Sequence, residues 1–235
     1  MRPPFISFAA AAIVFAAALS SAQALTLKVS PEVSLEMALP RELCALDPNG
    51  QPVERQVLGQ TEALHRGVNN VLAFLADCPA VEAARQSRPA EMKRWVIILA
   101  QLANGQLMRL QGVSRTEYLG EISKMMPGAE KIAEEATKET SARLAEQLKD
   151  QSASVGLQRM LGPLARDANG IYIGILTLNR VAGREMQVAG IGGFTFLRGH
   201  ALTVNFYTPY KEPRDFETLV GEAKAMAADL AKRND

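Results

Sequence analysis

The stretch from Ile171 to Tyr210 constrains the fold most strongly, because it contains three successive strand patterns joined by short connections. Ile171–Leu178 is almost wholly apolar and rich in β-branched residues, which indicates a strand buried on both faces. The second strand covers Phe194–Leu197 and can begin as early as Met186. In the third, Leu202–Tyr207, apolar and polar residues alternate, as in a half-buried strand. Such short connections predict antiparallel pairing, since a parallel crossover needs about a dozen residues or more.

The segment after this stretch predicts the clearest amphipathic helix of the chain. Pro209 ends the last strand because proline has no N–H to donate. Asp215 is placed to cap the helix that follows. A row of apolar side chains then falls on one helical face, which predicts packing against the sheet. The row consists of Phe216, Leu219, Val220, Ala223, Met226, Ala227 and Leu230.

Residues 1–24 have the pattern of a secretory signal peptide. Arg2 is the only charge before an uncharged run from Phe5 to Leu19, and Ala22-Gln23-Ala24 offers a small-residue cleavage site. The alternative is an uncleaved membrane anchor, but the run is shorter than the about 20 residues that span a bilayer. We therefore expect export to a bacterial periplasm with cleavage near Ala24, and no stable membrane insertion afterwards. Residues 25–235 are expected to form one α+β domain.

The chain has two cysteines, Cys44 and Cys78. An oxidising compartment and an even count predict a disulfide between them. A redox pair or a metal site is the alternative. It has less support, because C-x-x-C spacing is absent and only His65 and His200 could add imidazole ligands.

The N-terminal half predicts two strands and a helix. Leu25–Val29 and Val33–Leu39 alternate apolar and polar residues, as paired strands do. Apolar residues at helical spacing then predict a helix from about Gly59 to Asp77. Cys78 continues its apolar face, and Pro79 is expected to end it.

Further along, Arg94–Ala100 is an apolar run of strand length. Ser114 and Glu117 form a capping-box pattern, which predicts that a helix begins there. Residues 129–150 predict a second helix with a thin apolar stripe, either solvated or packed against a partner. Residues 150–170 carry the weakest pattern and are expected to form a flexible boundary.

The sequence contains no G-x-S-x-G, H-E-x-x-H or Walker A motif. The run Gly190–Gly193 does not complete a dinucleotide fingerprint, because Thr195 stands where the third glycine belongs and no predicted helix follows. A bulge or a close backbone approach explains the glycines better. A net charge of +1 gives no electrostatic reason to expect nucleic acid. We expect no cofactor and no metal, although the many acidic residues leave a carboxylate-based site open.

One candidate binding patch lies at the end of the last predicted strand. Tyr207 and Tyr210 have Lys211 and Arg214 close by in sequence. Exposed aromatic rings beside cations can form a recognition surface. Ordinary edge residues of the same types are the alternative, since single exposed aromatics are common.

The C-terminal pattern resembles the Mog1/PsbP-like α/β/α sandwich. The resemblance rests on the hairpin ending in Leu202–Tyr207, the connection Tyr210–Pro213 and the long closing helix. It implies an α+β fold, a mainly antiparallel sheet covered by helices, and an accessory or binding role rather than catalysis. The chain is also similar to exported bacterial proteins of unknown function. We therefore expect an exported, non-catalytic binding or accessory protein whose partner is a periplasmic or envelope protein. The alternative is a periplasmic hydrolase with a carboxylate-based site.

Overall fold

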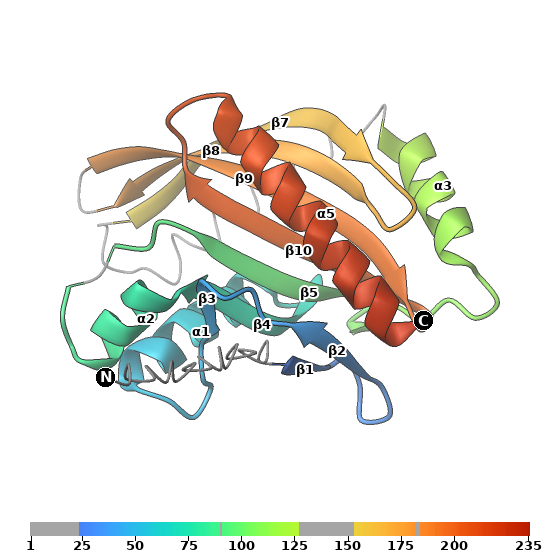
Figure 1. Ribbon diagram of the computed structural model, residues 1–235, viewed down its shortest axis with the longest axis horizontal. Helices are drawn as coiled ribbons and strands as arrows, with labels where there is room; N and C mark the ends of the chain where they lie inside the picture. Colours follow the sequence, from blue (N-terminus) through green and yellow to red (C-terminus); the bar gives the residue numbers. More distant parts are fainter. Residues whose placement is uncertain (1–23, 90, 127–152, 182–183) are drawn as a thin grey trace, which may run out of the picture.

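The computed structural model describes residues 24–89, 91–126, 153–181 and 184–235. Its centre is an eight-stranded sheet in which β10 lies between β5 and β9 (Figure 1). The strand order is β3-β4-β5-β10-β9-β8-β7, with β6 added beside β5, and every pairing is antiparallel. The strands are β3 Leu43–Ala45, β4 Asn69–Asp77, β5 Trp95–Ala103, β6 Gln106–Leu107, β7 Ala153–Arg166, β8 Ile171–Val181, β9 Arg184–Leu197 and β10 His200–Pro209.

The three strands predicted between Ile171 and Tyr210 are confirmed as β8, β9 and β10. Strand β9 pairs with β10 in unbroken register from Leu197–His200 to Val188–Pro209. The turn between them places Arg198 and Gly199 at positive φ, 48° and 80°, as a two-residue hairpin turn requires. The close backbone approach expected at the glycine run is also present: a Cβ on Gly190 would lie 3.0 Å from the Tyr207 ring.

Helix α5, Arg214–Asn234, covers one face of this sheet and lies across β8, β9 and β10 in Figure 1. Its predicted apolar row packs on the alternate side chains Leu202, Val204 and Phe206 of β10. A separate hairpin of β1, Ala24–Lys28, and β2, Ser34–Ala38, extends the same layer. Asn234 joins the helix to this hairpin, because its side chain both accepts from the Glu36 amide and donates to the Glu36 carbonyl.

The opposite face carries the other helices. Helices α1, Pro52–His65, and α2, Cys78–Arg85, lie at the β4–β5 end. Helix α3, Arg115–Met125, covers the far end near β8 and β9 and begins at the predicted capping box of Ser114. The structure is therefore α+β, a mainly antiparallel sheet with helices on both faces, as the sequence predicts.

The helix expected from Gly59 to Asp77 is wrong in its second half. Helix α1 ends at His65, Gly67 turns with φ of 81°, and Asn69–Asp77 forms strand β4. The apolar run in β4 pairs with β3 on one side and β5 on the other, so it satisfies a buried strand better than one helical face. Pro79 accordingly opens α2 at its first turn, where a missing N–H costs nothing.

Two smaller expectations are also corrected. Asp215 lies inside the first turn of α5, and its carboxylate accepts from the amides of Lys211 and Glu212 in the preceding loop. Residues 153–166 form the edge strand β7 and not a flexible boundary. Its pairing with β8 shifts register three times, and Gly162 has φ of 78° beside Pro163, which explains the weak sequence pattern. The signal peptide and the helix expected at 129–150 lie outside the described residues.

Candidate binding pocket between helices α1 and α2

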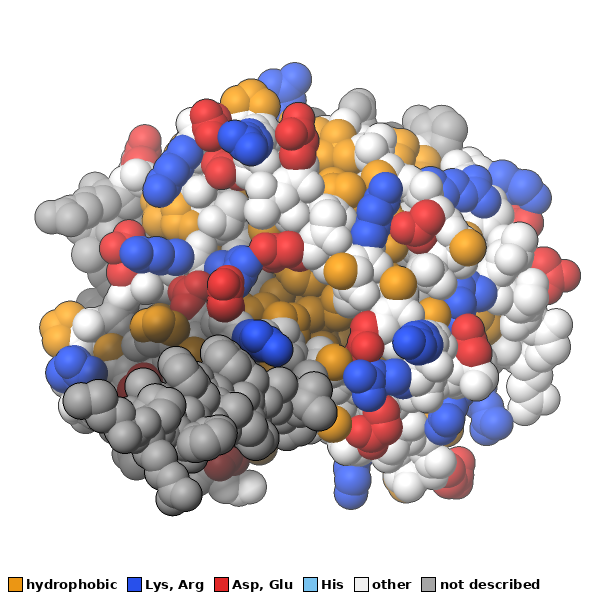
Figure 2. All heavy atoms as spheres, viewed as in Figure 1, with side chains coloured by type: hydrophobic (Ala, Val, Ile, Leu, Met, Phe, Trp, Pro, Cys, Tyr) orange, Lys and Arg blue, Asp and Glu red, His pale blue; other side chains and the backbone are white. Residues whose placement is uncertain are grey.

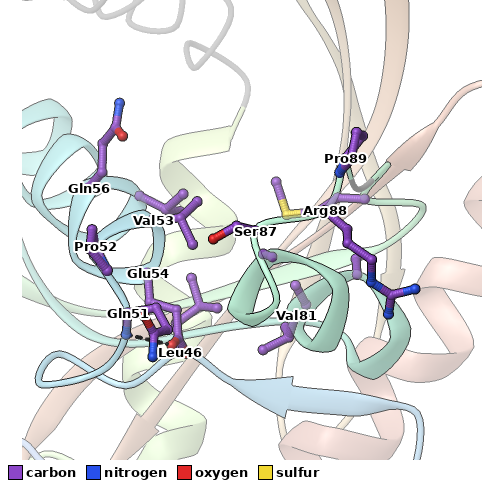
Figure 3. Close-up of a pocket in the computed structure, with 15 residues that line it drawn as sticks. Leu46, Gln51, Pro52, Val53, Glu54, Gln56, Val81, Ser87, Arg88 and Pro89 are labelled. Carbon is purple, nitrogen blue, oxygen red and sulfur yellow. Dashed lines mark hydrogen bonds between the residues drawn. The ribbon is translucent and has the colours of Figure 1, made fainter.

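A pocket of about 610 Å³ opens between α1, α2 and the segment that follows α2. Pro52, Val53 and Val57 line it from α1, and Ala80, Val81 and Ala84 line it from α2. The size falls within the range of roughly 300–1,000 Å³ that is usual for small-ligand sites. Figure 3 shows the two helices on either side of this space.

The wall of the pocket is mostly aliphatic. Leu46, Ala76, Pro89 and Met92 complete the apolar lining, and no aromatic ring occurs among its described residues. Val53 and Met92 are 37% and 38% exposed, although both are large apolar side chains. The pocket therefore presents apolar surface to solvent instead of closing over it.

Glu54 is the acidic side chain of this lining, and it is 2% exposed. Its carboxylate accepts hydrogen bonds from the amides of Asp47 (3.2 Å) and Gln51 (3.0 Å) and from Arg85 Nη2 (2.9 Å). Burial alone would raise the pKa of Glu54, but the bonds from Arg85 and the two amides outweigh it and lower the pKa. The carboxylate is thus ionised, neutralised and fully bonded, so it orders α1 and α2 and is not available for proton transfer.

The turn that ends α2 forms part of the mouth. The amide of Ser87 donates to Ala84 O (3.0 Å) and that of Arg88 to Ala83 O (2.9 Å), the bond pair of a Schellman motif. Ser87 takes the left-handed position with φ of 54°, where glycine is usual. Figure 3 shows the Ser87 side chain directed across the pocket toward Val53. The exposed Arg88 side chain has no ion pair or hydrogen bond with any residue that the structure describes.

The predicted disulfide between Cys44 and Cys78 is present. Cys78 is the first residue of α2, and Cys44 is the middle residue of β3. The bond therefore fixes the N-terminal end of one pocket wall to the sheet. Sequence reasoning found this bond but not the pocket that it supports.

The four residues of the predicted patch do not share one surface. Tyr207 stacks on Trp95 with ring centroids 5.5 Å apart, on the sheet face that α1 and α2 cover. Burial raises the pKa of Tyr207 to about 12. Tyr210 instead packs near Phe216 of α5, with centroids 5.7 Å apart, on the opposite face. Lys211 is exposed in the connection between β10 and α5, and Arg214 is exposed as the first residue of α5.

A second hollow, of about 440 Å³, lies between α5 and residues 38–43. Figure 2 shows it near the middle of the face, with a hydrophobic floor and charged side chains around it. Arg94 pairs there with Glu42 (2.6 Å) and also with Glu222. The pKa of Glu222 is raised overall, because the effect of burial exceeds the opposing effect of Arg94. The Arg94 guanidinium pairs with both carboxylates. Since Arg94 directly precedes β5, Glu222 lies in α5 and Glu42 lies in the β2–β3 connection, these ion pairs link the three segments.

Neither a metal cluster nor a spanning helix is found in the described part of the chain. Residues 24–89, 91–126, 153–181 and 184–235 contain no group of three or more His, Cys, Asp or Glu that could hold an ion. No helix among these residues has the length and apolar character needed to cross a membrane.

Comparison with known proteins gives likeness at the level of structure. No protein-family model matches the chain, and no curated protein matches it. The structure is similar to the solution structure of cyanobacterial PsbP (CyanoP) from Synechocystis sp. PCC 6803, with a TM-score of 0.35 and 11% identity over 83% of this chain and 84% of that chain. This match is to the kind of fold that the C-terminal sequence resembles. At this TM-score the likeness supports no inference on function.

Proposed function

We propose that this chain is an exported, non-catalytic binding protein that holds an apolar group of a periplasmic or envelope component in the pocket between α1 and α2. The observation that carries the proposal is the open aliphatic wall of a space of about 610 Å³. Exposed apolar surface of this kind is costly unless something covers it in use.

The periplasm as the compartment has support from two sides. The apolar run after Arg2 and the small residues before Leu25 predict an export signal. The bond between Cys44 and Cys78 persists best in an oxidising environment. One continuous main sheet, covered by helices from both halves of the chain, supports a single domain from residue 25 onward.

Binding without catalysis agrees with the chemistry of the pocket wall. Glu54 already accepts four hydrogen bonds, two of them from Arg85, which also balances its charge. A general acid or base needs a free position for the proton that it transfers. Glu54 lacks such a position, so the pocket offers shape and apolar contact rather than reaction chemistry.

Binding of the neutral fluorescent probe N-phenyl-1-naphthylamine tests this function. The mature protein should enhance the probe's fluorescence, and Ala84→Phe should weaken binding about tenfold or more, because the ring fills the apolar space. Ala83→Phe is the matched control: it lies on the same helix with similar burial but does not line the pocket. Absence of probe binding, or equal binding by both variants, would contradict the proposal.

A carboxylate-based hydrolase remains the second candidate, because Glu222 has a raised pKa and shares Arg94 with Glu42. A working pair would require Arg94 to move away from the space between the carboxylates. The candidate predicts hydrolysis of chromogenic esters or glycosides that Glu222→Gln abolishes. Equal rates for the wild type and the variant would exclude it.

A further inference from the structure

We infer that the pocket between α1 and α2 takes a linear aliphatic chain that ends in an anionic head group, with the alkyl carboxylates as its simplest members. This inference rests on the binding function proposed above and names the chemistry of its ligand. Three features carry it: the aliphatic wall, the neutralised carboxylate, and an exposed arginine of the lining that has no side-chain partner among the residues that the structure describes.

The wall offers apolar contact without aromatic stacking, so it can accept a ring-bearing apolar probe but should bind a slender aliphatic chain in preference to it. Alanines at 76, 80 and 84 leave space beside the branched side chains of Val53, Val57 and Val81. No aromatic side chain lies among the described lining residues to stack against a planar ligand. Methylene groups can fill such a wall by apolar contact alone.

The charges at the pocket favour an anion. Glu54 and Arg85 form a closed pair at 2.9 Å, so neither contributes an unbalanced charge. Arg88 lines the same space and keeps an unpaired positive charge within the part of the chain that the structure describes. In Figure 3 its side chain extends along the outside of α2, where it forms no side-chain hydrogen bond or ion pair with a residue that the structure describes. An anionic head at the mouth would attract this guanidinium in a charge-assisted bond, whereas a cationic head would be repelled.

Ser87 adds a polar donor on the same turn. Its left-handed backbone, φ of 54°, orients the hydroxyl toward Val53 across the opening. Backbone strain of this kind tends to persist at sites where a side chain must be presented in one direction. Ser87 therefore offers a hydroxyl beside the apolar channel, whereas the Arg88 guanidinium would have to rotate from the outside of α2 to reach a head group there.

Chain length gives the first test. The mature protein is loaded with N-phenyl-1-naphthylamine, which is then displaced by octanoate, decanoate and dodecanoate below their micelle-forming concentrations. Apparent affinity should rise about fourfold for each added methylene until the pocket is full, and then level off. Displacement that begins only when micelles form would overturn the inference.

The head group gives the second test. Decanoate should displace the probe at about fivefold or more lower concentration than decylammonium of equal chain length. Arg88→Ala should remove this preference and Arg88→Lys should retain most of it, when each displacement is referred to that variant's own affinity for the probe. Arg214→Ala, which removes an exposed cation at the start of α5, is the matched control and should change nothing.

The outcomes separate the two proposals. If Ala84→Phe blocks the probe but decanoate and decylammonium compete equally, the binding function stands and the anionic ligand is wrong. If the probe binds and no alkyl compound displaces it, the pocket accepts apolar groups other than alkyl chains and the inference again fails. If the probe itself does not bind, the proposed function falls first.

Discussion

Ser87 holds a left-handed backbone conformation that L-residues adopt at a cost of roughly 1–2 kcal/mol. Ser87→Gly should therefore raise the free energy of unfolding by about 1 kcal/mol, because glycine's extra freedom in the unfolded chain offsets only part of the strain relief. Ser87→Ala keeps the Cβ and the strain, so it should show no such gain. Urea unfolding measures both variants. Equal stability of the glycine and alanine variants would show that this turn is not strained.

His200 is 3% exposed, and neither ring nitrogen has a hydrogen-bond partner among the described residues. Burial lowers the pKa of His200 and outweighs the nearby Met108 backbone, which acts to raise it, while Arg109 adds a smaller lowering effect. Burial also lowers the pKa of His65. Each ring is therefore neutral in the folded protein at a pH where it binds a proton in the unfolded chain. Folding therefore loses no free energy to these histidines above their pKa in the unfolded chain, about 6.5. As the pH falls from there toward their lower pKa in the folded protein, protons bind the unfolded chain preferentially and the protein becomes less stable.

The prediction is a lower urea midpoint at pH 5 than at pH 7.5. His200→Gln should reduce that difference, because glutamine takes up no proton, and adding His65→Gln should reduce it further. Comparison of the wild type, the single variant and the double variant at both pH values checks this. An unchanged pH dependence in the double variant would place the effect in other groups.

At the scale of elements, the disulfide is expected to hold both the fold and the pocket wall. Its cysteines are separated by 34 residues, and closing a loop of that size stabilises a protein by about 3–4 kcal/mol in the chain-entropy model. Cys44→Ala with Cys78→Ala should cost about this amount. The same change should also weaken probe binding while the protein is still folded, because α2 loses its anchor to β3.

A matched control separates loosening of α2 from general destabilisation. Arg198 donates to the Asn234 carbonyl (3.1 Å) and the Ser34 carbonyl (3.2 Å), well away from the pocket lining. Arg198→Ala should lower stability and leave probe affinity unchanged. If both variants lose affinity in proportion to stability, the disulfide has no special role at the pocket.

The elements that the sequence predicted well are those with one unambiguous period. Polar and apolar residues alternate from Leu202 to Phe206 of β10, although the strand is buried on both faces and not half-buried as expected. Helix α5 carries apolar residues at helical spacing along its whole length. In the region of β4, Leu64, Val68, Val71, Leu72 and Leu75 also satisfy helical spacing. The continuous run from Val71 to Ala76 is equally typical of a buried strand, and only its pairing with β3 and β5 decides between the two.

The pocket was missed for the same reason. With 59–77 assigned to one helix, α1 and α2 do not exist as separate walls, and the apolar residues Val53, Ala80 and Met92 have no reason to meet. Glu54 and Arg85 are 31 residues apart, and no local pattern links them. Two local features of the sequence do indicate separate helices: Pro79 is typical of the first turn of a helix, and the segment Pro52–Val57 directly follows a turn.

At the scale of the whole molecule, α5 joins parts that are distant in sequence. Asp229 accepts from the Ala38 amide (2.7 Å), Asn234 bonds Glu36, and Glu222 pairs with Arg94. The terminal Asp235 also pairs with Arg115 at the start of α3. The helix thus connects the β1–β2 hairpin, the sheet and α3, while its apolar row closes the core on one face.

Deleting residues 215–235 should therefore leave a chain that does not unfold cooperatively, because one face of the sheet would be open to water. A point variant makes the same argument measurable in a folded protein. Leu230 is 0% exposed in the core cluster, and Leu230→Ala should cost about 2–5 kcal/mol. Lys232→Ala, an exposed change two residues later, should stay within about 0.5 kcal/mol of the wild type. A truncated chain that melts as sharply as the full one, or a Leu230→Ala variant no weaker than Lys232→Ala, would mean that the sheet is stable without its terminal helix.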